Sequence, residues 1–362
     1  MSMGEAGLVY TVRDRSLLLP LYKRFLVEPL IGFIPRSVDP NAITHVGHLI
    51  NLAGVILLLA FGAGGAPLPL LAAVLCLQVY NWCDNADGAH ARRTGRCSAM
   101  GELLDHGLDM LNTTYIAYAA AMSVSAPPVW WVAMALVLPA ACAVTYWEQA
   151  ETGLFSLGLL NQIESVTLLS AVLLVSATFG FGIWDRLHVG PVTARLLVMG
   201  FVSATALVGI TNNLWRVGRR KGAAVVLRVA PLVVFEVGVI LAALTGALAQ
   251  EAAVIVGTAG NVFFGLRSLA VRTAGDRPHV EPGMVAGAAL VLGLVAWGLL
   301  GHPGSYAIDV TASVSASLFF GAFAVANARD ARREVLRLDR AAAAAKPVLP
   351  IATAQGPARG LV

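Results

Sequence analysis

Two pairs of aspartates stand close together in a chain that is otherwise mostly apolar. Asp84 and Asp87 are three residues apart, and Asp105 and Asp109 are four apart, so each pair shares one face of a helix. If these two helices lie antiparallel across the turn at 88–100, four carboxylates converge and repel one another unless cations compensate them. Carboxylate oxygens suit hard divalent ions such as Mg²⁺ or Mn²⁺. Two such ions about 4 Å apart form a clamp for displacement at phosphorus.

The residues around the aspartates fit chemistry on a phosphate. Gly88 follows Asp87 and lets a ligand approach the backbone, and Gly101 does the same on the second helix. Arg92 adds a planar fork of donors that matches phosphate oxygens. The alternative is a set of ion pairs, Asp87 with Arg92 for instance, that only joins two helices. The number of acids, their helical spacing and the two glycines favour a site.

The composition tells which elements must position these residues. The chain is 57% hydrophobic and only 13% charged, whereas soluble domains carry about 25% charged residues. We therefore expect an all-α polytopic membrane protein. Its four cysteines have no paired spacing and indicate neither a disulfide framework nor a zinc site. The first 40 residues lack the short apolar core of a signal peptide.

Apolar segments of about 20 residues, long enough to span a bilayer, recur along the chain. We expect a single domain over 1–340, with its catalytic core at about 40–215 and a disordered tail at 341–362. The stretch RSLLLPLYKRFLVEPLIGFIPR (15–36) predicts an amphipathic helix in the membrane interface, although a short buried segment is the alternative. The predicted transmembrane helices number ten: about 43–62, 66–86, 101–122, 128–146, 161–180, 192–214, 226–246, 250–270, 283–301 and 305–327.

The basic residues predict the orientation of these helices. With ten spans, all the arginines and lysines except Arg186 and Arg195 fall on the side that holds both termini and the aspartate motif. Since cytoplasmic loops carry the excess of arginine and lysine, we expect that side to face the cytoplasm. The excess of arginine over lysine suggests a bacterial cytoplasmic membrane. Topology and anionic lipid account for the basic balance, so we expect no nucleic-acid partner.

The aspartates, glycines and arginine named above belong to one known pattern. Through it the chain resembles the CDP-alcohol phosphotransferases, integral membrane enzymes that move a phospho-alcohol from a CDP conjugate to an acceptor hydroxyl. The resemblance implies that the four aspartates hold two divalent ions at the diphosphate, while Gly88, Arg92 and Gly101 lie at the CDP moiety. The segment DPNAITHVGHLINL (39–52) is similar to the start of the family's first helix, which implies that Asn41 and Thr44 lie near the nucleotide. The matching pattern is Asp84-x2-Asp87-Gly88-x2-Ala91-Arg92-x8-Gly101-x3-Asp105-x3-Asp109.

Two further segments resemble the choline/ethanolamine phosphotransferase branch of this family. In GELLDHGLD (101–109), His106 stands beside the acidic face, where a neutral imidazole can accept the proton of an attacking hydroxyl. The segment YWEQAETGLFSLGLLNQIE (146–164) is similar to one that ends in a glutamate orienting this base, which implies that Glu164 pairs with His106. Several alternatives stay open. His106 could be structural, Glu164 could be an interfacial residue, and Glu102 is a competing partner for the histidine.

Taken together, the resemblance implies transfer from CDP-choline or CDP-ethanolamine to diacylglycerol in the bilayer, giving a phospholipid and CMP. Asp109 then serves both as a metal ligand and as part of the catalytic centre, and His106 with Glu164 supplies the base. Relatives are commonly homodimers. The nearest alternative is a phosphatidyltransferase that uses CDP-diacylglycerol and a soluble alcohol. A cation-coupled transporter is a remote alternative, because the acids cluster on one helix pair rather than in two repeated halves.

Overall fold

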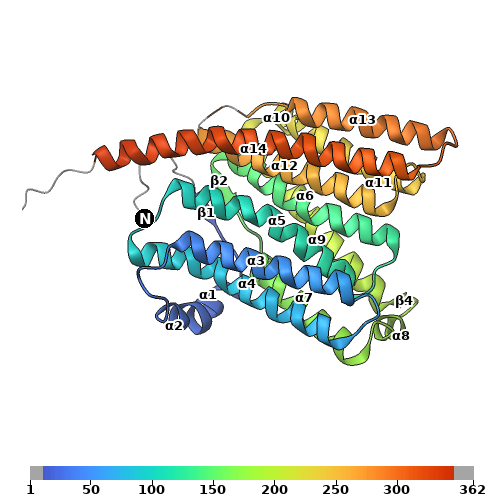
Figure 1. The fold of residues 1–362 in the computed structure, drawn as a ribbon, viewed down its shortest axis with the longest axis horizontal. Coiled ribbons are helices and arrows are strands. Elements are labelled where there is room, and N and C mark those ends of the chain that lie inside the picture. Colours follow the sequence, from blue (N-terminus) through green and yellow to red (C-terminus); the bar gives the residue numbers. More distant parts are fainter. Residues whose placement is uncertain (1–10, 275, 277, 346–362) are drawn as a thin grey trace, which may run out of the picture.

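The computed structural model describes residues 11–274, 276 and 278–345, and it is almost entirely helical (Figure 1). The long helices run roughly along one axis and form a bundle, while short strands and short helices lie near its ends. The elements in chain order are β1 (Thr11–Arg13), α1 (Leu19–Tyr22), η1 (Lys23–Val27), α2 (Glu28–Ile31), α3 (Pro40–Phe61), α4 (Pro67–Thr94), α5 (Ala99–Ser123), α6 (Pro128–Thr152), β2 (Leu154–Ser156), α7 (Gln162–Phe179), α8 (Ile183–Arg186), β3 (His188–Val189), β4 (Val192–Thr193), α9 (Ala194–Lys221), α10 (Ala223–Val226), η2 (Leu227–Val229), α11 (Ala230–Leu244), α12 (Gln250–Ala274), α13 (Pro282–Leu299) and α14 (Tyr306–Ala345).

Each of the ten predicted spans coincides with one long helix, which confirms the all-α membrane fold. Within the described part of the chain, seven helical segments are long and apolar enough to cross a bilayer: α3, α6, α7, α9, α10 to α11, α12 and α13. In α14 the apolar part is shorter, at residues 306–322. Helices α4 and α5, which carry the aspartates, do not meet the same measure. The count of ten spans therefore stays a prediction.

Helix α12 lies at the centre of the second half of the bundle. It packs against α5, α6, α11 and α14, and 67% of its apolar window is buried, against 11% for α9. Small residues make this packing close, as is common between membrane helices. A Cβ atom added at Gly265 of α12 would lie 2.5 Å from Met110 Sδ of α5. In the same way, a Cβ at Gly47 of α3 would lie 2.6 Å from Cys83 Cβ of α4. These glycines set the spacing of the helices around the aspartates.

The N-terminal segment forms the helix expected from its sequence. Residues 19–31 are continuously helical through α1, η1 and α2, and Leu21, Phe25 and Leu30 leave apolar surface exposed. This arrangement suits a helix that lies in the membrane interface. At the other end of the chain, α14 continues to Ala345, so the first five residues of the predicted tail are helical. Residues 346–362 lie outside the described residues.

Two small sheets join segments that lie outside the long helices. Strand β1 pairs in parallel with β2, so the N-terminal segment contacts the loop between α6 and α7. Strands β3 and β4 form an antiparallel pair beside α8, at the opposite end of the bundle in Figure 1. The first sheet lies next to the aspartate-bearing helices and matters for the site.

Candidate active site

The turn between α4 and α5 sets the register of the two aspartate-bearing helices. Gly95 adopts the left-handed conformation (φ 69°) and ends α4, where the Arg96 N–H closes onto the Ala91 carbonyl. Three residues later Ser98 caps α5, its hydroxyl accepting a 3.0 Å hydrogen bond from the Gly101 N–H. This short connection turns the chain back, so that the last turns of α4 are followed directly by the first turns of α5. Direct packing between them is slight: α4 packs mainly on α3, whereas α5 packs on α6, α3 and α12.

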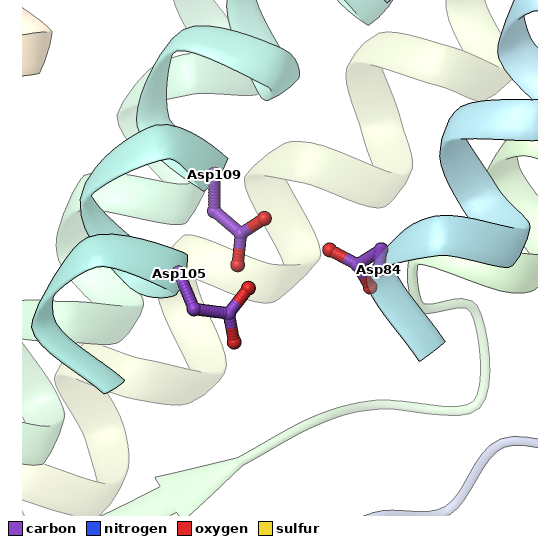
Figure 2. A group of neighbouring side chains, drawn as sticks. All are labelled: Asp84, Asp105 and Asp109. Atoms are coloured by element: carbon purple, nitrogen blue, oxygen red, sulfur yellow. The ribbon is translucent and has the colours of Figure 1, made fainter. Parts of the chain in front are cut away.

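Three of the four aspartates meet across the space between these helices. Figure 2 shows Asp105 and Asp109 pointing from α5 toward Asp84 on α4. One carboxylate oxygen from each residue lies within 4.8 Å of the other two. Each of these side chains is partly buried. The convergence predicted from helical spacing is thus found for three carboxylates.

The fourth aspartate, Asp87, is held apart from this group. Its Oδ2 accepts a 2.5 Å hydrogen bond from the Thr44 hydroxyl of α3, and its Oδ1 accepts from the Gly88 N–H. Asp87 is 5% exposed, so these bonds replace water. Thr44, predicted only as a nucleotide neighbour, therefore orients a signature carboxylate. A role for Asp87 as a metal ligand stays a prediction.

The donor set fits a divalent cation. Three carboxylates from two helices present oxygen ligands to one point, and hard cations such as Mg²⁺ prefer such ligands. Asp105 Oδ1 is buried and has no hydrogen-bond partner among the described residues. Buried acceptors are rarely left unpaired. A bound cation would satisfy this oxygen and neutralise the three neighbouring charges.

Four of the residues predicted to lie at the nucleotide meet as two pairs. Asn41, in the first turn of α3, approaches Gly101, where an added Cβ would lie 3.2 Å from Asn41 Oδ1. The guanidinium of Arg92 folds back over Gly88, with Nη1 3.4 Å from an ideal Cβ at that glycine. Asp39 caps α3 by accepting a 2.9 Å hydrogen bond from the Asn41 N–H. The two glycines thus leave room next to one amide and one guanidinium.

The other arginines of the motif stabilise the fold. Arg93 donates to the carbonyls of Ile31 (2.7 Å) and Ile34 (2.6 Å), and so fixes the segment that precedes α3. His90, which is fully buried, lies 3.0 Å from the Val38 carbonyl through Nε2. Of the three arginines at 92, 93 and 96, Arg92 is the one that lies over Gly88. Arg96, like Arg93, donates hydrogen bonds to backbone carbonyls, in its case those of Ser37 and Val38.

Two tyrosines that the sequence analysis did not identify hold Asp109. Tyr146 of α6 donates to Asp109 Oδ2 at 3.2 Å, and Tyr80 of α4 donates to Oδ1 at 3.4 Å. The Gln162 amide in turn donates to the Tyr80 hydroxyl at 3.1 Å. Tyr80 stands four residues before Asp84 on the same helix, a spacing that could have indicated it. Tyr146 gives no such signal, since α6 meets α5 only through the tertiary fold.

His106 lies beside the carboxylates in an aromatic setting. It is 9% exposed, and its ring centroid lies 5.2 Å from Phe155 and 5.4 Å from Tyr146. Its Nδ1 atom is buried without a hydrogen-bond partner among the described residues. Glu102, the competing partner considered above, forms a 2.7 Å ion pair with Arg272 of α12. That pair joins α5 to the second half of the bundle.

The structure does not bring Glu164 and His106 into a hydrogen bond. Glu164 is the third residue of α7, where it closes a capping box with Asn161. Its other oxygen accepts hydrogen bonds from the N-terminal segment, at Ser16, Leu17 and Leu18. Both oxygens of Glu164 accept hydrogen bonds from other donors in this structure, and the direct pair with His106 stays a prediction.

Comparison with known proteins adds independent information. Residues 38–199 match the model of the CDP-alcohol phosphatidyltransferase family. The chain is 29% identical over 204 residues to cholinephosphotransferase 1 of Homo sapiens, covering 53% of this chain and 49% of that protein. It is 31% identical over 209 residues to cholinephosphotransferase 1 of Gallus gallus, covering 55% and 61%. The chain thus spans about half the length of the human relative and somewhat more of the avian one.

Proposed function

We propose that the chain transfers phosphocholine or phosphoethanolamine from its CDP conjugate to diacylglycerol, because residues 38–199 match the model of the CDP-alcohol phosphatidyltransferase family. The products are a phospholipid and CMP. The observation that carries this proposal is the meeting of Asp84, Asp105 and Asp109, carboxylates of the family signature, at one point between two helices. Relatives named cholinephosphotransferase 1 support the choice of substrate class.

The signature carboxylates would hold the divalent cations, Mg²⁺ or Mn²⁺, at the diphosphate. When bound, such cations neutralise the diphosphate and the charge that develops on the departing CMP. Tyr80 and Tyr146 orient Asp109, and Thr44 orients Asp87. Binding of two ions would employ Asp87 together with the other three carboxylates.

Arg92, Gly88, Gly101 and Asn41 bind the CDP moiety in this proposal. Arg92 offers its guanidinium to phosphate oxygens, and the missing side chains at both glycines let the diphosphate approach the backbone. Diacylglycerol reaches the site from the bilayer, in which its chains already lie. The distribution of arginine and lysine supports a site on the cytoplasmic side, where the CDP-alcohol is dissolved.

His106 acts as the general base. The acceptor hydroxyl attacks the β-phosphorus, a new oxygen–phosphorus bond forms, and the bond to the oxygen that bridges to the α-phosphate breaks. The electron pair leaves with CMP, and the hydroxyl proton passes to the imidazole of His106. The transfer is direct and needs no covalent enzyme intermediate.

An assay of purified protein in diacylglycerol-containing vesicles tests this function. CDP-choline, CDP-ethanolamine and CDP-diacylglycerol are supplied in turn, each with a suitable acceptor and with Mg²⁺ or Mn²⁺, and CMP is measured. We expect release from CDP-choline or CDP-ethanolamine that depends on diacylglycerol. Asp105→Asn should abolish it, whereas Asp185→Asn in α8, at the opposite end of the bundle, should not. Release only from CDP-diacylglycerol would assign the chain to the phosphatidyltransferases that use soluble alcohols.

A further inference from the structure

The carboxylate of Glu164 ties the N-terminal segment to the loop that follows α6. Its Oε1 accepts hydrogen bonds from Ser16 Oγ (2.6 Å), Leu17 N (2.8 Å) and Leu18 N (2.9 Å). The residue is 4% exposed, so water contributes little to its solvation. Hydrogen bonds to a carboxylate are stronger than those between neutral groups. This contact therefore joins two segments of the chain that lie 147 residues apart in the sequence.

The same N-terminal segment binds the loop at two other places. We call residues 11–18 the strap and residues 153–161 the site loop. Strand β1 of the strap pairs in parallel with β2 of the site loop, and the Leu157 N–H donates to the Arg13 carbonyl at 2.8 Å. Near the end of the loop, the Asn161 amide donates to Asp14 Oδ1 at 3.0 Å. The strap thus holds the site loop near both of its ends.

The site loop in turn supports the catalytic histidine. Phe155 lies in β2 and stacks on the imidazole of His106, with 27° between the ring planes. It also stacks on Tyr146, whose hydroxyl bonds Asp109. In Figure 2 a strand and the coil after it run below the three carboxylates. Ring contacts, rather than a hydrogen bond to Nδ1, therefore surround the imidazole in this structure.

The backbone of the site loop is conformationally free at two glycines, although Leu154 and Phe155 pack on the bundle. It begins at Gly153, which ends α6 in the left-handed conformation (φ 66°), and it contains a second glycine, Gly158. Glycine gives the chain more conformational freedom than any other residue. The strap therefore contributes to the position of Phe155, and Glu164 in turn holds the strap.

We propose that Glu164 and Ser16 are positioning residues for His106, acting through the strap, the site loop and Phe155. This inference rests on the proposed function and names how its base is oriented. It replaces the direct pair expected between Glu164 and His106. Glu164 acts on His106 indirectly. It keeps the ring of Phe155 packed against the imidazole, so that the imidazole nitrogen that takes the proton faces the acceptor hydroxyl.

The test combines a structural readout with kinetics. Glu164→Gln keeps an oxygen for the capping box with Asn161 but loses the charge that holds the strap, and Ser16→Ala removes one donor more gently. Hydrogen exchange of the Leu157 amide reports on the strap without any substrate. We expect faster exchange in both variants. The matched control is Glu251→Gln, at an exposed glutamate in the first turn of α12, which should leave the exchange unchanged.

The kinetic arm uses CDP-choline or CDP-ethanolamine with diacylglycerol. Glu164→Gln should lower kcat by about tenfold, a part of what general-base catalysis supplies, and leave the KM for the CDP-alcohol almost unchanged. Phe155→Leu should cause a similar loss, and the double variant should be no worse, because both changes act along one path.

Two results would overturn the proposal. One is normal protection of the Leu157 amide in Glu164→Gln together with a lower kcat, which would favour a direct contact with His106. The other is a double variant Glu164→Gln, Phe155→Leu whose loss of kcat equals the product of the two single losses. If the wild-type protein transfers nothing, the proposed function fails, whereas the exchange measurement still decides whether Glu164 holds the site loop.

Discussion

The hydroxyl of Tyr146 donates to Asp109 Oδ2 at 3.2 Å, so a helix outside the signature orients one of the signature carboxylates. Tyr80 reaches the other oxygen of the same group, which leaves Asp109 with its rotation fixed on both sides. Partners of this kind hold a ligand in the orientation that a cation needs, and their loss typically weakens metal binding by tenfold or more. The two tyrosines therefore belong to the proposed metal centre although neither is a ligand.

Tyr146→Phe tests this arrangement. The change keeps the ring that contacts His106 and removes only the hydroxyl, so we expect Mn²⁺ to bind about tenfold more weakly. Titration of the protein with Mn²⁺, followed by electron paramagnetic resonance, measures this affinity without substrate. Tyr118→Phe is a matched control, because the hydroxyl of Tyr118 contacts Thr258 rather than an aspartate. Equal affinity in wild type and Tyr146→Phe would contradict the assignment.

His106→Ala separates catalysis from binding. Loss of a general base lowers turnover by about 10²–10⁴-fold, while the contacts of Arg92 and the glycines with the CDP moiety persist. We expect kcat to fall within that range and the Kd for the CDP-alcohol, measured by calorimetry, to change little. Unchanged turnover would remove His106 from the mechanism.

Gly101→Val probes the nucleotide side of the site. Even a Cβ at this position would lie 3.2 Å from Asn41 Oδ1 and 3.3 Å from Ser98 Oγ, so two further methyl groups crowd both the asparagine and the space reserved for substrate. We expect the KM for the CDP-alcohol to rise by about tenfold or more, since misplacing one group that binds the substrate weakens its binding by at least that factor. Gly209→Val, at a glycine with open space around it, is the control.

A buried ion pair near the C-terminal end of α6 predicts a large effect on stability. Glu148 is fully buried and accepts two hydrogen bonds from Arg216 of α9, at 2.5 and 2.6 Å. Glu148→Gln leaves this arginine without its counter-charge, and we expect the free energy of unfolding to fall by about 3 kcal/mol. Thermal unfolding in detergent measures the change. Asp185→Asn, which breaks the more exposed pair with Arg195, should cost less than about 1 kcal/mol.

The sequence predicted the fold well where hydrophobic length and helical spacing determine it. Ten apolar segments located ten helices, and the four-residue spacing of Asp105 and Asp109 placed both on the face that meets Asp84. The partners of these residues were not predictable in the same way. Thr44 reaches Asp87, and Tyr146 reaches Asp109, through contacts between helices that are far apart in the chain. Such contacts depend on how helices pack, and no local periodicity records them.

Glu164 shows the same limit most clearly. Its distance in sequence from both His106 and Ser16 gives no preference between them, and the resemblance favoured the histidine. The structure instead uses Glu164 at a helix start, where an N-terminal strand brings three donors to it. Pairing of β1 with β2 decides this outcome, and three-residue strands leave little pattern in a sequence.

Transfer of labelled phosphorus tests the central claim most directly. CDP-choline and CDP-ethanolamine carrying ³²P in the β-phosphate are supplied to wild-type protein and to Asp105→Asn in vesicles with diacylglycerol and Mg²⁺. We predict that the wild type moves the label from at least one of them into phospholipid and releases unlabelled CMP, whereas folded Asp105→Asn transfers none. Label that stays in both CDP-alcohols with the wild type, or equal transfer by Asp105→Asn, would contradict the account.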